Sequence, residues 1–442
     1  MKQSKSTFEL IKCAAREGWK ELNLTDHNLK ELPQKLFRLK QLETLIYSPK
    51  RGGIKHLPPE IGNLRNLRKL ELSGKNQICE LPPEIGRLHN LTDLDLSHNC
   101  LRLLPPEIGQ LCNLHSLNLS YNYIEHFPVE ITQLKELSIL HLSHGMSVNK
   151  IESVVLEVCQ LNCLSSLDLS YNHIKELPPE FNQLQNLLKL NLYSTMLETF
   201  PQEVCQLKNL NRLEICGNRF SEIPPEIVQL KNLSELSLKL NCLHIEKLPT
   251  EITELRNLTH LILGCSGLTK LPLEICQIRS LRKLSLYSNR LIEIPPEIKN
   301  LHKLEELSLI NSSLLTVPDS ITHLKSLKSL NLNFNHIRTL PKTIARLSGL
   351  MHLHLEGNRL ETLPENIGDL RQLRTLKLYN NRLKELPPSI CKLRKLNSLS
   401  FLGNPDLQPY PPGCEHLQEL YPLHRKPKPG APKLYAIISY DD

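Results

Sequence analysis

Leucine and isoleucine recur along this chain in a repeating pattern, which is clearest between Leu91 and Asn113. In this segment Leu94 and Leu96 alternate with the polar residues Asp93 and Asp95. Alternation with a period of two residues predicts a β-strand with one buried face and one face in water. The segment therefore begins with a short, half-buried strand.

The residues after this strand predict a turn and a return path. Asn99 follows the strand, and a buried amide there can satisfy backbone groups of its own coil and of the next. Pro105 and Pro106 favour an extended segment, because proline fixes φ and disfavours a helical predecessor. Ile108 and Leu111 are then expected to be buried on a short helical or 3₁₀ turn.

The same unit recurs in phase along most of the chain. The second leucine of the strand has 17 counterparts, mostly 23 residues apart: Leu24, Tyr47, Leu72, Leu96, Leu119, Leu142, Leu169, Leu192, Ile215, Leu238, Leu263, Leu286, Leu309, Leu332, Leu355, Leu378 and Phe401. The pattern L-x-x-L-x-L-x-x-N-x-L is the signature of the leucine-rich repeat, whose coils form a core only when stacked. The predicted fold is an α/β leucine-rich-repeat solenoid (horseshoe) of about 17 coils. It has a concave parallel β-sheet and short helical or 3₁₀ segments on the convex side.

Four segments are expected from this pattern. Residues 1–18 predict an N-terminal capping helix, which Ser6 or Thr7 begins and Gly18 ends. Residues 19–410 form the solenoid and residues 411–423 a C-terminal cap. Residues 424–442 combine a linker rich in basic residues, proline and glycine with a short terminal strand. Longer repeat intervals predict inserted loops at 50–53, 75, 145–148 and 244–247.

Cysteine usage and the lack of targeting signals favour the cytoplasm. No apolar run follows the N-terminus, and no stretch of about 20 apolar residues could span a membrane. The 13 cysteines are an odd number and are scattered. Cys159, Cys205, Cys276 and Cys391 share one position that glycine holds in other coils, which indicates a small packing slot rather than a disulfide or a metal site.

Charge and motifs argue against nucleic-acid binding and catalysis. The net charge of +8 is spread over lysines and arginines that alternate with glutamates, which is typical of a solvated surface. The chain has no glycine-rich phosphate loop, no H-E-x-x-H and no G-x-S-x-G. Two histidine pairs, at 141 and 144 and at 352 and 354, lack the further ligands that zinc requires. No enzyme activity, cofactor or metal is predicted.

Two stretches resemble known families. The Leu-Pro-Pro-Glu-Ile form of the repeat, as at Leu81–Ile85, resembles the Ras-group intracellular leucine-rich-repeat proteins over about residues 19–410. This resemblance implies a non-catalytic scaffold or sensor in intracellular signalling, with a protein partner such as a small GTPase or another signalling protein.

The second resemblance is in the tail, where residues 437–440 (Ile-Ile-Ser-Tyr) are similar to the first strand of Toll/interleukin-1-receptor (TIR) domains. Tyr435 and Ala436 depart from the Tyr-Asp pair that usually precedes that strand. As an alternative, the resemblance implies that this chain is the ligand-sensing N-terminal half of a TIR signalling protein. The NAD-cleaving or adaptor function of such a domain would then lie outside this chain.

Partner-binding residues are expected on the concave face, where side chains between and beside the strand leucines vary from coil to coil. Exposed tyrosines on a sheet have no duty in the core and are frequent in interface hot spots. The other interpretation is that tyrosine at the strand exit only stacks on its neighbours. A first anchor patch is predicted at Tyr121, His141, His144, Tyr171 and Tyr193, and a second at Phe334, His352, His354 and Tyr379. The further candidates are Asp93, Asp95, Asp168, Arg212, Lys283, Tyr287 and Lys377.

Overall fold

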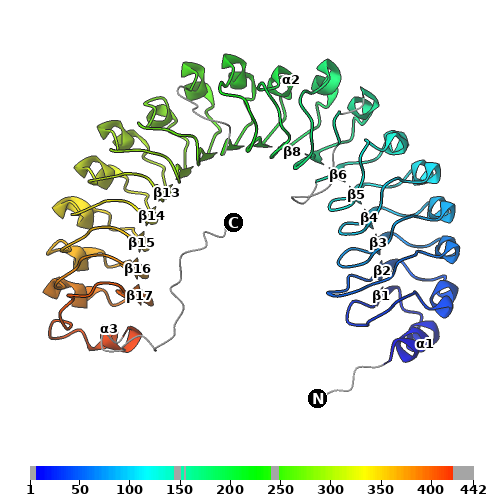
Figure 1. Cartoon of the computed structure of the whole chain (residues 1–442), viewed down its shortest axis with the longest axis horizontal. Coiled ribbons are helices and arrows are strands. Elements are labelled where there is room, and N and C mark those ends of the chain that lie inside the picture. Colours follow the sequence, from blue (N-terminus) through cyan, green and yellow to red (C-terminus); the bar gives the residue numbers. More distant parts are fainter. Residues whose placement is uncertain (1–5, 144–150, 154–155, 240–247, 422–442) are drawn as a thin grey trace. The chain divides into compact units, whose positions relative to one another are not determined.

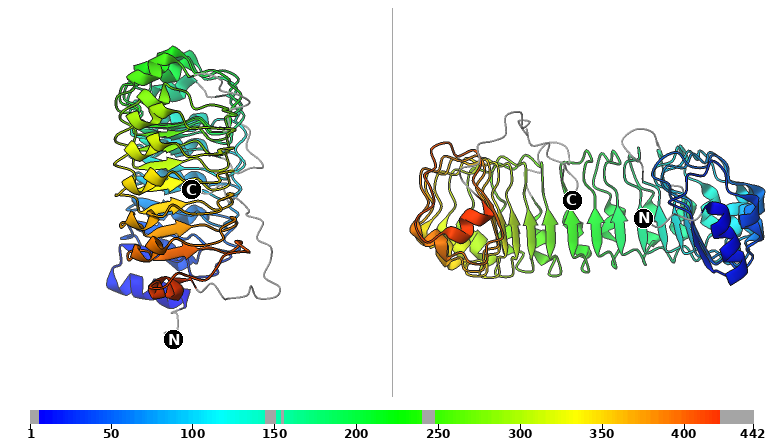
Figure 2. Two further views of the ribbon diagram at one scale, coloured as in Figure 1. Left: turned by 90° about the vertical axis from the view of Figure 1, so that its left-hand side faces the viewer. Right: turned by 90° about the horizontal axis from the view of Figure 1, so that it is seen from below.

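The computed structural model describes residues 6–143, 151–153, 156–239 and 248–421. It divides the chain into two units, Met1–Arg290 (unit 1) and Leu291–Asp442 (unit 2). Each unit is a stack of coils, and each coil has one three-residue strand. Figures 1 and 2 show that the strands of a unit lie side by side, with the 3₁₀ helices on the opposite side of the coils.

The described strands of unit 1 are parallel, and each pairs with the next along the chain. They are β1 (Glu21–Asn23), β2 (Thr44–Ile46), β3 (Lys69–Glu71), β4 (Asp93–Asp95), β5 (Ser116–Asn118), β6 (Ile139–His141), β7 (Ser166–Asp168), β8 (Lys189–Asn191), β9 (Arg212–Glu214), β10 (Glu235–Ser237), β11 (His260–Ile262) and β12 (Lys283–Ser285). Those of unit 2 pair in the same way. They are β13 (Glu306–Ser308), β14 (Ser329–Asn331), β15 (His352–His354), β16 (Thr375–Lys377) and β17 (Ser398–Ser400).

The return path of most coils contains a short 3₁₀ helix. In unit 1 these are Gln34–Arg38, Pro59–Asn63, Pro83–Arg87, Pro106–Gln110, Val129–Gln133, Leu156–Gln160, Pro179–Gln183, Pro225–Gln229, Thr250–Glu254 and Ile275–Gln277, with the short α-helix α2 (Gln202–Cys205) in one coil. In unit 2 they are Pro296–Asn300, Asp319–His323, Lys342–Arg346, Ile367–Asp369 and Pro388–Lys392. The sequence also forms α1 (Thr7–Glu17) and α3 (Glu415–Leu420).

Proline and the apolar spacing produce each coil in the predicted way. Pro105 is extended, with φ −71° and ψ 147°, and the 3₁₀ helix begins at Pro106. Ile108 and Leu111 are fully buried. The residues that mark the repeat, from Leu24 to Phe401, are buried in every coil. The predicted leucine-rich-repeat solenoid, with 17 parallel strands and short 3₁₀ turns in the described residues, is confirmed.

A buried asparagine joins most coils to the coil before; Thr195, Ser266 and Ser312 hold its position in three coils. The Asn122 amide donates to the carbonyl oxygen of Leu119 in its own coil, at 2.9 Å, and to that of Leu96 in the preceding coil, at 2.9 Å. Its Oδ1 accepts from the backbone N–H of Leu101, also in the preceding coil, at 3.0 Å. The sequence analysis predicted that the amide bonds to the next coil, and this was wrong. The amide of Asn122 points towards the end of the strand in the preceding coil. Asn99, Asn218, Asn289, Asn335, Asn358, Asn381 and Asn404 repeat these donor bonds.

Helix α1 lies against the first coil. The Ser6 hydroxyl accepts from the backbone N–H of Glu9, and the Glu9 carboxylate accepts from the backbone N–H of Ser6, which is a capping box. Gly18 ends the helix at φ 66°, a left-handed conformation that glycine adopts without strain. The Thr7 hydroxyl lies 2.9 Å from Nδ1 of His27. In the first coil, His27 holds the position that the buried asparagines hold in later coils; we call it the ladder position. The contact between Thr7 and His27 fixes α1 against the first coil.

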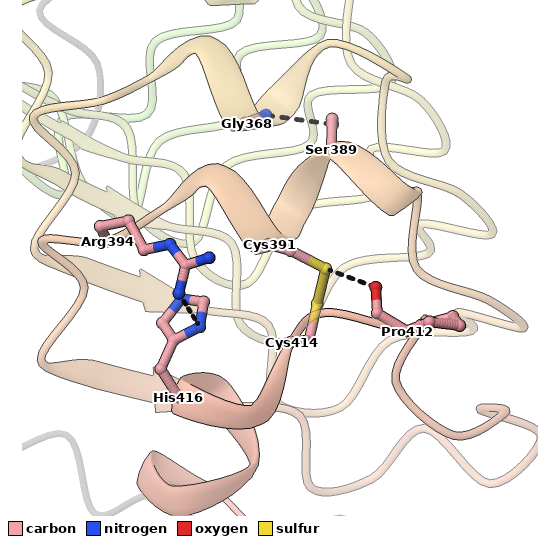
Figure 3. The surroundings of a disulfide bond; sticks show 7 residues. All are labelled: Gly368, Ser389, Cys391, Arg394, Pro412, Cys414 and His416. Carbon is pink, nitrogen blue, oxygen red and sulfur yellow. Dashed lines mark hydrogen bonds between the residues drawn. A yellow bond between two sulfur atoms is a disulfide. The ribbon is translucent and has the colours of Figure 1, made fainter.

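A disulfide joins the last two turns of unit 2, which corrects the prediction that Cys391 fills a packing slot. Cys391 is bonded to Cys414 (Figure 3). The two residues are 23 positions apart, one repeat period, so Cys414 occupies the place that the next coil would give to the same position. The remaining members of the predicted set, Cys159, Cys205 and Cys276, are buried and unbonded, as expected for packing.

The segment after β17 closes the last coil with aromatic contacts. The Phe401 ring centroid lies 6.2 Å from that of Tyr410 and 6.2 Å from that of Tyr421. The Tyr410 hydroxyl donates to the carbonyl oxygen of Tyr421 at 2.9 Å. Leu417 of α3 is buried. These rings cover the apolar end that the last strand would otherwise expose.

Some predictions lie outside the described residues. These are the loops at 145–148 and 244–247, the linker at 424–433, the TIR-like strand at 434–442, and His144. All of them stay predictions. Across the described ranges, no helix is both long enough and apolar enough to cross a membrane.

Replacing the buried Asn122 with alanine should destabilise the folded protein and leave its surface chemistry unchanged. The change leaves the buried backbone N–H of Leu101 without its partner, at a cost of about 1–3 kcal/mol. Asn113→Ala, at the end of the preceding coil, is the matched control, because the Asn113 amide also bonds to the coil before its own, at His89, but is exposed. Urea unfolding should show a clearly larger loss for Asn122→Ala. Equal losses for the two variants would contradict the bridging role.

Candidate functional site

The strand face, defined as the outward side of the strands, is the surface on which the predicted partner-binding residues lie. In β4 the burial pattern is exposed, buried, half-buried for Asp93, Leu94 and Asp95, and the other strands alternate similarly, except β10, where Ser237 is also buried. The central leucine points into the core, so the residues on either side of it point outwards. Their identity is free of packing constraints, so this face can be adapted to a partner.

The strand face of unit 1 has a hollow of about 630 Å³ across four neighbouring strands, β6 to β9. We name it the β6–β9 hollow. Three predicted residues, His141, Asp168 and Arg212, are brought together in its lining, although they are widely separated in the sequence. The lining side chains also include Ile139, Ser165, Ser166, Leu188, Lys189, Asn191 and Glu214.

One side of the hollow is an ion-pair network. The Arg212 guanidinium is bonded to the Glu214 carboxylate on the same strand. It also lies 3.3 Å from the Glu235 carboxylate on β10. Arg212 is thus held in place by two carboxylates, which leaves its exposed edge available to a partner. Leu188 is 46% exposed at a position that is polar in most coils, so it gives the hollow an apolar edge.

Two tyrosines stand together at the strand exits beside this hollow. The ring centroids of Tyr171 and Tyr193 are 4.9 Å apart, with an angle of 54° between the planes. The Lys239 ammonium lies 5.5 Å from the Tyr193 ring centroid. Burial, and then the neighbouring Tyr171, raises the pKa of the Tyr193 hydroxyl to about 12. The Tyr193 phenol therefore stays neutral at physiological pH and acts as a hydrogen-bonding aromatic group.

Tyr121 is not part of this pair. Its ring stacks on His98 of the preceding coil, with centroids 4.1 Å apart and planes within 9°. The Tyr121 side chain is 44% exposed, and its backbone has a left-handed φ of 57°. A bulky residue pays a steric cost in that conformation. His144, the other predicted member of the first patch, lies outside the described residues.

Two of the predicted carboxylates also hold the backbone. Oδ1 of Asp95 accepts from the backbone N–H of Ser97 at 2.8 Å, and Oδ1 of Asp168 accepts from that of Ser170 at 2.9 Å. This local bond shapes the strand exit, as Asn or Asp does in an Asx-turn. Asp93 is exposed and accepts instead from the Thr92 hydroxyl at 2.7 Å.

The second predicted patch lies on three consecutive coils of unit 2. Phe334 packs over Gly357, where an added Cβ would lie 2.5 Å from its ring. His352 Nδ1 lies 3.1 Å from the Thr375 hydroxyl on β16. Tyr379, half-buried, follows β16, and its carbonyl oxygen accepts from the backbone N–H of Gly357. Aromatic and imidazole groups thus share one side of these coils.

The surroundings of His354 in this patch perturb the pKa of its imidazole. Burial, and then His352 and Lys377, lowers the pKa of its imidazole below the usual value of 6.5. Lys377 is its register partner on β16. The neutral form of His354 is therefore favoured in the folded protein.

The last two candidates lie on and beside β12 in unit 1. Lys283 is exposed on that strand. The Tyr287 ring packs over Gly264, where an added Cβ would lie 2.4 Å from the ring. Among the described residues, no three His, Cys, Asp or Glu side chains converge in a way that could hold a metal ion.

Sequence reasoning missed several lining residues, namely Ile139, Leu188, Lys189, Asn191 and Glu214. All but Leu188, which directly precedes β8, are in the same outward positions as the predicted ones, so the repeat register was the signal that could have found them. Leu188 was overlooked because it is apolar and directly follows Leu187, so in the sequence it reads as a core residue.

Family models match several parts of the chain. The model described as a leucine-rich repeat region matches residues 352–431, and leucine-rich-repeat models match residues 279–337, 90–111, 113–134 and 163–184. No curated protein matches the sequence.

Solved structures match over most of the chain. A leucine-rich-repeat protein of Leptospira interrogans is 33% identical, with a TM-score of 0.64, over 95% of this chain and 97% of its own. A TDR receptor is 28% identical, with a TM-score of 0.64, over 86% and 67%. A plant peptide hormone receptor, RGFR1 in complex with RGF2, is 27% identical, with a TM-score of 0.52, over 86% and 74%.

The environment of His354 predicts a pH-dependent stability. Because its folded-state pKa is below the unfolded value of 6.5, folding binds fewer protons, and the contribution of neutral His354 is fully present above pH 6.5. That contribution is lost as the pH falls below 6.5 and through the folded-state pKa. His354→Gln should therefore reduce the drop in the urea midpoint between about pH 7 and pH 5.

His336→Gln, an exposed histidine in the same unit, is the control and should leave that drop unchanged. An identical pH profile for wild type and His354→Gln would show that the surroundings of His354 do not act in this way.

Proposed function

Because the chain belongs to the leucine-rich-repeat proteins, we propose that it is a non-catalytic binding protein that holds a protein or peptide partner on its strand face. The observation that carries this proposal is the β6–β9 hollow with the Tyr171 and Tyr193 pair beside it. The hollow offers apolar, hydrogen-bonding and charged groups together. RGFR1, which is 27% identical, is a peptide hormone receptor solved in complex with RGF2, and this supports a peptide-type partner here.

The geometry fits binding better than catalysis. The carboxylates of the hollow are engaged, Glu214 by Arg212 and Asp168 by the backbone of Ser170. Acid–base chemistry requires groups with perturbed pKa values in a site that excludes water. An aromatic pair on an open sheet instead supplies contact area to a partner at a small cost in side-chain entropy.

The finer proposal is a cytoplasmic signalling protein whose partner is a small GTPase or another signalling protein. The Leu-Pro-Pro-Glu-Ile repeats support it, and so do the unbonded cysteines, of which Cys79, Cys112 and Cys163 are exposed. The Cys391–Cys414 bond argues against it, because disulfides persist mainly in oxidising compartments.

Alkylation of the protein inside cells, followed by mass spectrometry, tests the compartment. Cytoplasmic protein should show Cys391 and Cys414 alkylated, with Cys112 as the internal standard for an accessible thiol. An unalkylated, bonded pair beside alkylated Cys112 would contradict the cytoplasmic proposal.

The alternative, a ligand-sensing half of a TIR signalling protein, rests on the resemblance of residues 437–440. Such a protein would hold its ligand on the same strand face. The two proposals differ in the coding DNA, which under the alternative continues past the Asp442 codon into a domain of alternating strands and helices.

Selection of a random peptide library on the full chain tests the binding proposal. The double variant Tyr171→Ala/Tyr193→Ala should weaken binding of the selected peptides at least tenfold, because truncating a hot-spot aromatic of an interface costs about 2 kcal/mol or more of binding free energy. Leu188→Glu should do the same by placing a charge at the apolar edge of the hollow while sparing the core.

Tyr123→Ala is the matched control, since this tyrosine is 37% exposed but follows Asn122, away from the strand face. It should bind the peptides as wild type does. If the selected peptides bind all four proteins equally, the hollow and its tyrosines are not the binding site.

A further inference from the structure

Charge is distributed unequally over the strand faces of the two units. Seven acidic residues lie in the strands of unit 1: Glu21, Glu71, Asp93, Asp95, Asp168, Glu214 and Glu235. Strands β14, β15, β16 and β17 of unit 2 read Ser-Leu-Asn, His-Leu-His, Thr-Leu-Lys and Ser-Leu-Ser, and they contain no acidic residue. This part of unit 2 is therefore a face without negative charge.

Basic groups occupy the middle of that face. Lys377 lies on β16, and Arg374, which is exposed, directly precedes that strand. His352 and His354 lie on β15, paired in register with Thr375 and Lys377. We name these four residues, Arg374, Lys377, His352 and His354, the basic face.

Among the described residues, Arg374 and Lys377 have no carboxylate partner. Ion pairs of unit 2 join Lys328 to Glu305 and Lys392 to Asp369, and they leave both cations of the basic face out. This differs from the hollow of unit 1, where Arg212 is paired with two carboxylates. The charge of the basic face is left for an external group.

The acidic residue Glu356 lies two positions past the end of β15 and is already engaged. Its carboxylate accepts from the Asn333 amide at 2.9 Å, and its backbone N–H donates to Oδ1 of the same residue at 2.8 Å. Glu356 is thus tied to the coil before it rather than to the cations. The effect of Lys377 on His354 is consistent with a positive local potential, because it disfavours protonation of the imidazole.

Aromatic side chains border the basic face at the strand exits. Phe334 and Tyr379, both half-buried, follow β14 and β16, on coils whose strands carry no acid. A peptide lying over the strands would meet two cations and then two rings. Charged side chains give orientation and specificity, and the rings add contact area.

We propose that the strand face of β14 to β17 binds an acidic segment of a protein partner, with Arg374 and Lys377 holding its carboxylates. This proposal rests on the proposed function and adds the chemical class of the partner. Arg374 directly precedes β16 and Lys377 ends it, so one short acidic segment lying over this strand can reach both cations. Arginine and lysine bind carboxylates through charge-assisted hydrogen bonds.

A nucleic acid is a poorer match to this face. Proteins that bind it usually neutralise several phosphates along a basic stripe, commonly about 6–10 of them. The basic face offers two permanent cations, while His354 favours its neutral form. An acidic peptide needs only two such contacts.

The test uses the full chain and a fluorescein-labelled octaglutamate peptide, followed by fluorescence anisotropy at low salt. Wild type should bind the peptide, and Arg374→Glu/Lys377→Glu should weaken binding at least tenfold. Arg374→Gln/Lys377→Gln, which removes charge without reversing it, should give an intermediate loss. Unchanged urea midpoints establish that these substitutions, at exposed Arg374 and half-buried Lys377, leave the fold intact.

Arg382→Glu/Lys384→Glu is the matched control. Both residues are exposed in the same coil but lie beyond the strand, so the net charge changes equally while the strand face does not. The control should bind within twofold of wild type. Equal losses for the two charge-reversed proteins would overturn the proposal, as would an absence of octaglutamate binding to wild type. Tighter binding of a labelled oligouridylate at the same salt would overturn it in favour of nucleic acid.

Failure here is separable from failure of the proposed function. Library peptides that depend on Tyr171 and Tyr193, together with no octaglutamate binding, would refute the acidic partner and leave the hollow of unit 1 in place. Octaglutamate binding that depends on Arg374 and Lys377, together with peptides indifferent to the tyrosines, would refute the hollow alone.

Discussion

The buried asparagine at most strand exits is the contact on which the coil-to-coil stacking depends. A coil with three strand residues cannot enclose a core, so it is stable only against its neighbours. The Asn122 amide pairs backbone groups of two coils that no strand bond reaches. Because leucine packing tolerates small shifts and hydrogen bonds do not, this amide fixes the register in which the leucine layers stack.

This constraint separates the positions that form the fold from those that can bind. The leucines recur in every coil and the asparagine and the prolines in most, whereas the residues beside each strand leucine face outwards and differ between coils. In unit 1 this freedom produces a hollow with an ion-pair network and a tyrosine pair. On strands β14 to β17 of unit 2 it produces a face with histidines and no acid, whose two cations have no ion-pair partner among the described residues. One scaffold thus carries two surfaces of different chemistry.

The repeat made the strands, the buried second leucine of each strand segment and the 3₁₀ turns predictable, because each depends on residue spacing within one coil. Contacts between coils were harder to predict. Asn76 holds the ladder position in its coil, but the extra Lys75 obscured it in the sequence. The Cys391–Cys414 bond was missed although its spacing is one repeat period. The roles of Asp95 and Asp168 at the strand exits were missed because a carboxylate on a strand reads as surface charge. The hollow depends on side chains from four coils, so composition alone did not reveal it.

The most direct test of the account is hydroxyl-radical footprinting of the full chain, alone and with a peptide selected from the library. The account predicts that bound peptide lowers the oxidation of Tyr171, Tyr193 and His141, while Tyr123 reacts as before, because binding uses the outward strand positions. Protection of Tyr123 or of the 3₁₀ helices, with the two strand-exit tyrosines unprotected, would contradict the claim that the strand face is the binding surface.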